Sequence, residues 1–251
     1  MGKADLHIHT TYSDGTCTVE VALEWAANFT GLDVVAITDH DTLDGSRKAQ
    51  EIAPKYGIEV IPGCEITTRD GHMLALFLQR LIQPGLSMLE TVLRVGEQGG
   101  LCIPAHPTDY LAHGVSREAL RQVLRDQDAR RVLIGLEAIN TGILNQKANH
   151  AAAQIAKDFG LSPTGSSDSH VFWTIGSGYT TFEGYTAEDA RCALLAGKTS
   201  ARRVTETRSP GYWPRHVVSF MLRKAGWVTW TAEPNAGFEL RRLNDIRARS
   251  A

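Results

Sequence analysis

The sequence lacks the features that mark several specialised protein classes. Its 251 residues contain no run that approaches the roughly 18 consecutive apolar residues of a membrane span. The segment after Met1 turns directly into an acidic, histidine-containing stretch, without the apolar centre of a secretory signal peptide. The four cysteines include no Cys-x-x-Cys pair, which argues against a disulfide framework and favours a reducing compartment. We therefore expect a cytoplasmic protein with no membrane contact.

The chain also lacks an excess of charge of one sign. The 26 Lys and Arg residues against 28 Asp and Glu residues give a formal net charge of −2, so no global field favours nucleic acid or an anionic membrane. The charge is unevenly distributed, because residues 202–251 hold ten Lys and Arg against four Asp and Glu. We expect one domain over residues 1–201, with residues 202–251 as a basic extension that packs on it or trails from it. This extension contains Trp213, Trp227 and Trp230, and a solvated or partly packed segment is favoured over a surface that contacts nucleic acid or a membrane.

Short apolar runs alternate with amphipathic stretches along most of the chain. The expected strands are Asp5–His9, Val34–Thr38, Glu59–Ile66, Met73–Leu78, Leu101–Ala105, Val132–Ile139 and Leu161–Gly165. The expected helices include Val19–Phe29, Leu86–Glu97, Ser116–Asp126 and Ala148–Phe159, with Thr18, Thr42 and Thr186 as helix caps. This alternation predicts an α/β fold with a parallel sheet, either a barrel or a doubly wound sheet. About seven strands in roughly 200 residues favour a small (β/α) barrel.

Two histidines occupy alternate positions in the first predicted strand. His7 and His9 would point to the same side of the strand, because side chains alternate with a period of two. Two neighbouring imidazoles can bind one metal ion at about 2.1 Å. On its own, the pair is almost equally well explained as two structural histidines on an edge strand.

Further histidines and carboxylates follow or border other predicted strands. They are Asp14, His40, Glu65, His72, His106, Asp168 and His170. Most lie where strands end, which is the edge at which parallel α/β folds collect functional side chains. The set contains no thiolate, so its ligand chemistry suits Zn, Mn or Fe, and its size predicts two or three divalent metal ions. Three other histidines, His113, His150 and His216, lack such a context, and Asn140 either faces the site or forms a turn.

The motifs, taken in order, resemble those of the PHP (polymerase and histidinol phosphatase) superfamily. They are D-L-H-I-H-T-x-x-S-D-G, T-D-H-D, G-C-E-I, a histidine opening an apolar run, A-H-P and S-D-S-H, between about Asp5 and Lys198. The resemblance implies a distorted (β/α)7 barrel with a metal cluster that is commonly trinuclear. It implies one metal held by His7, His9, Glu65 and Asp168, a second by Glu65, His72 and His106, and a third by Asp14, His40 and His170.

The resemblance also implies an activity. The S-D-G and T-D-H-D forms look like those of stand-alone phosphoesterases that act on nucleotides. We therefore expect a metal-dependent phosphoric ester hydrolase whose metal-bound hydroxide attacks a small-molecule phosphomonoester, namely the terminal phosphate of a nucleotide or nucleotide bisphosphate. Asp39 would orient the imidazole of His40 or shuttle a proton, and the orienting role is preferred.

Three alternatives stay open at this point. Histidinol phosphate would be a different substrate for the same chemistry. A 5′–3′ exoribonuclease would act on short RNA and could use the basic extension as a strand-binding surface. A non-catalytic metal-binding scaffold is disfavoured, because every expected ligand position carries a metal-competent side chain.

Overall fold

The computed structural model describes residues 1–142 and 146–204. The strands are β1 (Gly2–Ile8), β2 (Val34–Ile37), β3 (Glu59–Thr68), β4 (Gly71–Leu76), β5 (Leu101–Pro104), β6 (Gly135–Asn140), β7 (Ser162–Ser166), β8 (Gly178–Phe182) and β9 (Ser200–Arg203). The helices are α1 (Val19–Trp25), α2 (Asp44–Ile52), α3 (Met88–Gly96), α4 (Arg117–Val123), α5 (Gln127–Val132), α6 (Gln146–Phe159) and α7 (Ala187–Leu195). All seven predicted strands are present with shifted ends, and β8 and β9 were not predicted.

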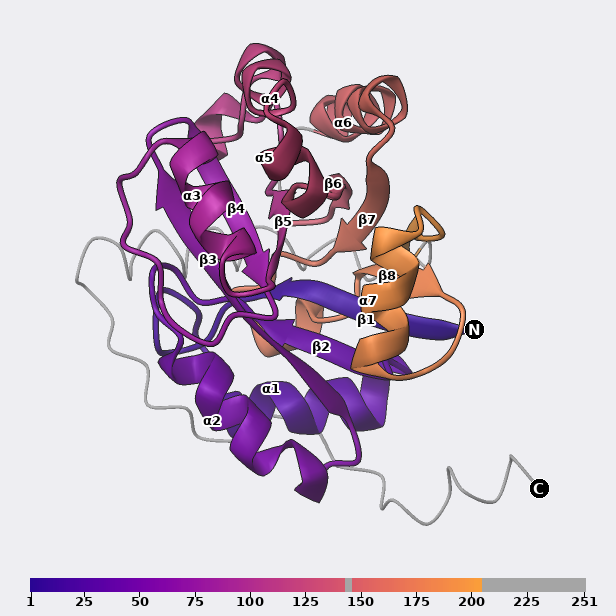
Figure 1. Ribbon diagram of the computed structural model, residues 1–251. Coiled ribbons are helices and arrows are strands. Elements are labelled where there is room, and N and C mark those ends of the chain that lie inside the picture. The colour runs from indigo at the N-terminus through magenta and orange to yellow at the C-terminus, as the bar shows by residue number, and fades with distance from the viewer. Residues whose placement is uncertain (143–145, 205–251) are drawn as a thin grey trace. The chain divides into compact units, whose positions relative to one another are not determined.

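The strands form a curled mixed sheet, a half-barrel within an α/β fold (Figure 1). Seven strands run in the order β5-β4-β3-β2-β1-β8-β9, and β6 pairs with β7 in a separate two-stranded sheet. The curled α/β sheet agrees with the predicted distorted barrel. The expected parallel pairing is found for β1–β2, β2–β3 and β6–β7. It is wrong for the other pairs, because β3–β4, β4–β5, β1–β8 and β8–β9 are antiparallel. Only Arg69 and Asp70 separate β3 from β4, and so short a connection can join only antiparallel neighbours.

The helix boundaries follow from local capping. Thr18 accepts a hydrogen bond from the backbone N–H of Val21, and Thr186 forms a reciprocal capping box with Asp189, so both predicted caps are confirmed. The prediction for Thr42 is shifted by one residue, because Leu43 occupies the cap position while the Thr42 hydroxyl accepts from the Asp44 N–H at 3.2 Å. Within the predicted helix over 19–29, α1 gives way to one π-helical turn, Ala26–Thr30.

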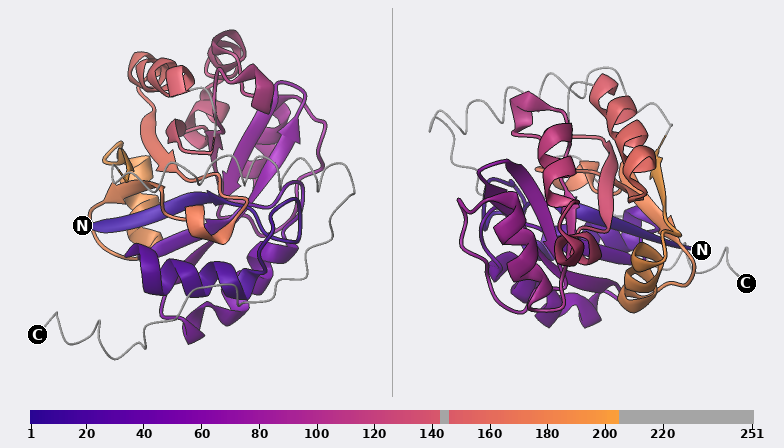
Figure 2. Two further views of the ribbon diagram at one scale, coloured as in Figure 1. Left: turned by 180° about the vertical axis from the view of Figure 1, so that it is seen from behind. Right: turned by 45° about the horizontal axis from the view of Figure 1, so that its top comes forward.

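Both faces of the central strands are buried. On β2, Val35 and Ile37 pack with α1 and α2, whereas Val34 and Ala36 belong to a second apolar cluster on the opposite face. Figures 1 and 2 show α1 and α2 together against one side of β1 and β2, while α3 to α6 lie with the other strands. Burial on both faces explains why these strands read as continuous apolar runs. The buried histidines and carboxylates on and just beyond these strands are therefore the exceptions that mark a site.

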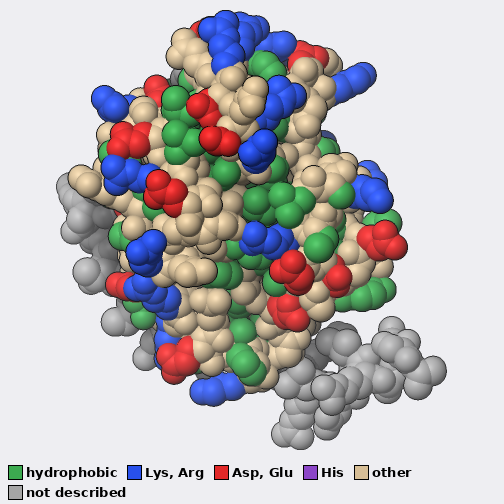
Figure 3. Space-filling model, in the orientation of Figure 1, with side chains coloured by type: hydrophobic (Ala, Val, Ile, Leu, Met, Phe, Trp, Pro, Cys, Tyr) green, Lys and Arg blue, Asp and Glu red, His purple; other side chains and the backbone are tan. Residues whose placement is uncertain are grey.

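The outer surface carries charges of both signs. On the face shown in Figure 3, basic and acidic side chains are interspersed. Over the described ranges, no helix has the length and hydropathy needed to cross a membrane. The described fold continues through β9 to Arg203, two residues past the predicted domain boundary at 201. The predicted extension beyond Val204, with its three tryptophans, lies outside the described residues.

Candidate metal centre

Two imidazoles lie at the C-terminal end of strand β1. His7 is the next-to-last residue of β1 and His9 follows its end, and both are fully buried. Their Nε2 atoms lie 3.0 Å apart. Because side chains alternate in direction along a strand, the two rings lie on the same side and close together, as the H-x-H pattern predicts.

The carboxylate of Glu65, from the middle of β3, lies at the centre of the cluster. Its side chain is almost fully buried. Oε2 lies 3.0 Å from His7 Nε2, 3.2 Å from His9 Nε2 and 3.3 Å from His40 Nδ1, while Oε1 lies 3.0 Å from His72 Nδ1 and 3.1 Å from His106 Nε2. One carboxylate thus contacts five imidazoles from four different chain segments.

His72 reaches the same edge because β4 reverses direction. In the antiparallel β3–β4 pair, His72 lies opposite Thr67, two residues beyond Glu65. The beginning of β4 is therefore adjacent to the end of β3, and His72 shares the face on which Glu65 lies. This explains how a histidine that opens a strand joins others that follow strand ends.

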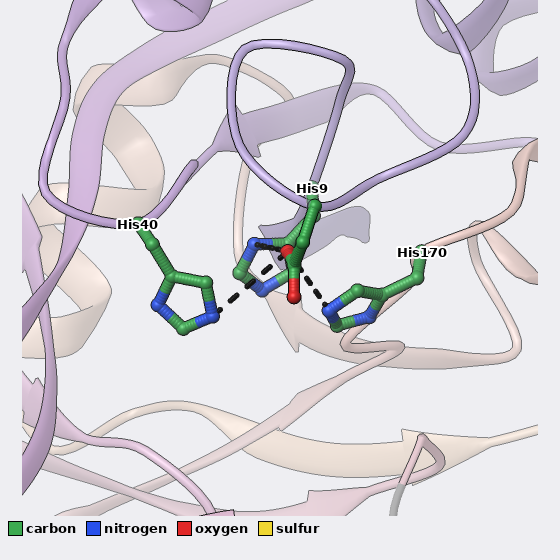
Figure 4. Close-up of side chains that lie close together, drawn as sticks. His9, His40 and His170 are labelled. Carbon is green, nitrogen blue, oxygen red and sulfur yellow. Dashed lines mark ion pairs between the residues drawn. The ribbon is translucent and has the colours of Figure 1, made fainter. Parts of the chain in front are cut away.

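The loop after β7 supplies the last two predicted residues. Asp168 adopts a positive φ of 50°, and its Oδ1 lies 3.4 Å from His7 Nε2 and 3.3 Å from His9 Nε2. Figure 4 shows His9, His40 and His170 converging, with ion pairs drawn as dashed lines. These pairs meet at Asp14 Oδ1, which lies 3.6 Å from His9, 3.9 Å from His40 and 3.2 Å from His170.

The structure thus brings all nine predicted ligand residues into one cluster. Their donor atoms form four overlapping groups, each with atoms within 4.8 Å of one another: His9, Asp14, His40 and His170; His7, Glu65 and His106; His7, His9 and Asp168; His40, Glu65 and His72. The predicted trio Asp14, His40 and His170 stays together. Glu65 contacts both His72 and His106, but these two histidines fall into different groups.

The donor chemistry fits divalent cations. Bonds of about 2.1 Å place two ligands of one ion within roughly 4 Å of each other, which is the spacing of these imidazole and carboxylate atoms. A set of nitrogen and oxygen donors without thiolates matches Zn, Mn or Fe. Multiple buried groups of this kind are those of a multi-metal site. The assignment of individual ligands to individual ions stays a prediction.

Burial and close opposite charges shift the pKa values throughout the cluster. Burial would lower the pKa of His9, but the carboxylates of Asp168 and Glu65 outweigh it and raise that pKa to about 10. Burial would raise the pKa of Glu65, yet the imidazoles of His7, His106 and His72 hold it well below its usual value. Asp14 likewise has a lowered pKa, because His170, His9 and His40 outweigh its burial. In the metal-free protein, the histidines and carboxylates of this cluster therefore stabilise each other's charged forms.

Asp39 contacts the loop that carries Asp14. Its Oδ1 accepts hydrogen bonds from the Thr10 N–H and the Ser13 hydroxyl, and its Oδ2 accepts one from the Thr10 hydroxyl, each at 2.7 Å. The side chain is almost fully buried. These contacts favour a role in which Asp39 positions this loop, rather than the predicted role of orienting the imidazole of His40.

Three polar residues outside the nine predicted ligands support the cluster. Asp5, fully buried, accepts hydrogen bonds from the backbone N–H groups of Ser167 and Gly176 and so ties β1 to the loop after β7. Glu137 and Asn140, on β6, contact predicted ligands. Asn140 both faces the cluster and accepts a hydrogen bond from the Gly142 N–H at 2.8 Å, the kind of contact that forms a turn. The available signal was the cost of burying a lone carboxylate inside the apolar run Leu136–Ile139.

The comparisons with known proteins agree with this geometry. The family model of the PHP domain matches residues 5–161, and that of a PHP-associated region matches residues 146–199. An uncharacterized protein of Methanocaldococcus jannaschii is 36% identical over 166 residues, which cover 58% of this chain and 88% of that protein. A 5′–3′ exoribonuclease of Haemophilus influenzae is 44% identical over 66 residues, which cover 26% of this chain and 24% of the enzyme.

A solved structure supports the fold. A two-domain protein from Bacteroides vulgatus, described as containing a predicted PHP-like metal-dependent phosphoesterase, superposes with a TM-score of 0.67 at 23% identity. The match covers 80% of this chain and 64% of that one, so this chain spans just under two thirds of its length. The family match over more than half of the sequence, the curled sheet and the clustered ligands lead to one conclusion: the chain belongs to the PHP domain family, with a multi-metal type of site.

Proposed function

We propose that the chain hydrolyses a terminal phosphate monoester, most favourably of a nucleotide or nucleotide bisphosphate, in a metal-dependent reaction. The observation that carries this proposal is the convergence of four overlapping histidine–carboxylate groups on one edge of the half-barrel. Divalent cations held there would supply an activated water and neutralise phosphate charge. Two or three such ions would exceed the negative charge of Asp14, Glu65 and Asp168, and their local field would attract a phosphate although the chain is slightly acidic.

The exposure of the side chains gives the direction of substrate approach. His7 and His9 are fully buried, whereas the side chains of Asp14, His40 and His170 are 32%, 28% and 25% exposed. The phosphate therefore enters from the Asp14–His40–His170 side, and the leaving group points to solvent. Glu65 and the buried imidazoles form the floor of the site, opposite the side that faces solvent.

The test is phosphate release by protein reconstituted with Mn²⁺, Zn²⁺ or Fe²⁺. The panel holds mononucleotides, nucleotide bisphosphates, oligoribonucleotides and histidinol phosphate. The matched variants are His9→Ala, inside the cluster, and His150→Ala, an exposed histidine on α6. We expect His9→Ala to lose activity at least 100-fold and His150→Ala to retain it. Full activity of His9→Ala would overturn the proposal.

A second candidate is 5′–3′ exoribonuclease activity on short RNA. The identity of 44% over 66 residues with the Haemophilus influenzae enzyme favours it. In the same panel, release of mononucleotides from a 5′-phosphorylated oligoribonucleotide, faster than phosphate release from any nucleotide, would select this candidate. The reverse order would select the phosphatase.

A further inference from the structure

Glu137 is the buried carboxylate that the proposed chemistry does not use. It lies within β6, is fully buried, and belongs to none of the four groups of candidate ligand atoms. Its two oxygens contact nitrogen atoms of His7, His106 and Asn140 that are not among the candidate metal-binding atoms. A buried charge of this kind is costly unless each oxygen has a defined partner.

One oxygen of Glu137 selects the protonated nitrogen of His7. Oε1 lies 3.0 Å from His7 Nδ1, whereas His7 Nε2 faces Glu65 Oε2 at 3.0 Å and Asp168 Oδ1 at 3.4 Å. A carboxylate accepts but cannot donate, so Nδ1 must carry the proton in this pair. The lone pair of His7 is then on Nε2, which faces the cluster.

The other oxygen holds the backbone that carries His106. Oε2 accepts a hydrogen bond from the His106 backbone N–H at 2.6 Å. His106 has a φ of 28°, a left-handed conformation that a residue with a side chain rarely adopts. The charge-assisted hydrogen bond opposes relaxation of this backbone and keeps His106 Nε2 at 3.1 Å from Glu65.

Asn140 extends the contact to a third ligand. Its Nδ2 donates to Glu137 Oε2 at 2.9 Å and to Asp168 Oδ2 at 3.0 Å. Asp168 thereby has Oδ2 engaged by the amide, while its Oδ1 faces the imidazoles of His7 and His9. The carboxylate of Glu137 and the amide of Asn140 together touch three candidate ligands from behind.

We propose that Glu137, braced by Asn140, is the positioning residue of the metal centre: it fixes the His7 tautomer that can bind a metal and orients His106 and Asp168. This inference rests on the proposed metal-dependent function. It adds a supporting carboxylate on β6 to the nine predicted ligands, and such partners typically change metal affinity by about 10- to 100-fold.

The Glu137→Gln variant gives a sharp test, because two donors dictate how the new amide lies. The His106 N–H and the Asn140 amide both donate to Oε2, so the glutamine oxygen must occupy that side. Its NH₂ group then faces His7 Nδ1 and donates to it. His7 then adopts the tautomer with the proton on Nε2. In this tautomer Nε2, the nitrogen that faces the cluster, has no free lone pair for a metal.

The measurement is Zn²⁺ affinity and stoichiometry, read by competition with a chelator and without any phosphate substrate. We expect Glu137→Gln to bind Zn²⁺ about 10- to 100-fold more weakly. The melting temperature of the metal-free protein should fall as well, because the buried His7 loses its carboxylate partner. Asn140→Ala should show a smaller loss. The control is Thr164→Val, since Thr164 lies opposite Glu137 in the β6–β7 pair and donates to the Leu136 carbonyl at 3.2 Å. Wild-type zinc affinity in both Glu137→Gln and Asn140→Ala would overturn the inference.

A second measurement needs no variant at Glu137 and so holds even if Glu137→Gln fails to fold. In the imidazole ¹H–¹⁵N spectrum of the zinc-loaded wild type, His7 should carry its proton on Nδ1, and a proton on Nε2 would overturn the inference. Zinc binding without hydrolysis would overturn only the proposed function. A wild type that binds no zinc would overturn both.

Discussion

Glu65 Oε2 lies 3.0 Å from His7 Nε2, and both side chains are buried from solvent. This contact joins β1 to β3 at the edge where the other candidate ligands gather. Removing one partner leaves the other buried and unpaired, which usually costs more than the pair contributes as a unit.

Glu65→Gln should therefore affect both folding and metal binding. In the metal-free protein we expect a loss of about 3–5 kcal/mol in the free energy of unfolding, because several imidazoles lose their shared carboxylate. Urea titration measures this loss, and elemental analysis measures the lowered metal content. The control is Glu51→Gln, on the exposed end of α2, which should change stability by less than about 0.5 kcal/mol. Equal effects of the two substitutions would contradict the central position of Glu65.

Metal binding should release protons. The carboxylates of Asp168 and Glu65 raise the pKa of His9 to about 10 in the metal-free protein, against the effect of burial, so His9 is protonated at pH 7. A metal ion binds only the neutral imidazole, so each loading event expels a proton and apparent affinity rises as the pH increases toward 10. Calorimetric titration in buffers of different ionisation enthalpy counts the protons released. Buffer-independent heats would show that His9 is already neutral.

The metal-free protein should lose stability at high pH. A histidine with a pKa raised from 6.5 to about 10 contributes stability that is fully present below pH 6.5 and lost as the pH rises through about 10. We therefore expect the melting temperature of the chelated protein to fall between about pH 8 and 10. The His9→Ala variant should show a flatter profile over this window, and an identical fall in wild type and variant would assign the effect to other groups.

Asp39 offers a choice between a loop-positioning role and a proton shuttle. Asp39→Ala removes three hydrogen bonds to Thr10 and Ser13, so we expect a loss of about 1–3 kcal/mol in stability and weaker metal binding near Asp14. Asp39→Asn keeps an oxygen for Thr10 and Ser13, while the Thr10 hydroxyl can turn to accept from the new amide. If positioning is its role, asparagine restores activity and leaves the shape of the pH–rate profile unchanged. A shuttle would leave the asparagine variant as inactive as the alanine variant.

The sequence was most informative where a histidine or a carboxylate follows a run of apolar residues. His40, His106 and Asp168 were identifiable because each follows a short buried run, and the carboxyl ends of parallel strands share one edge. Thr18 and Thr186 were likewise recognisable as caps from local pattern alone. These signals span a few residues, so no tertiary information is needed to read them.

The features that were missed depend on distant contacts. Glu137 contacts His7 across 130 positions of the chain, so its place in an apolar run signals burial but does not reveal its partner. The reversal of β4 depends on the two-residue turn at Arg69 and Asp70, which the apolar pattern does not encode. Strand β8 follows the Phe172–Thr174 turn and alternates buried with half-buried residues, so it lacks the continuous apolar run by which the other strands were recognised.

The most direct test of the account measures metal content and phosphate release on the same sample. Chelated protein is reloaded stepwise with Mn²⁺ or Zn²⁺, and a nucleotide bisphosphate is supplied at each step. The account predicts that activity is absent in the chelated protein and rises with the binding of two or three ions per chain. Full hydrolysis by the chelated protein, or loading with two or three ions without hydrolysis of any phosphate ester, would contradict it.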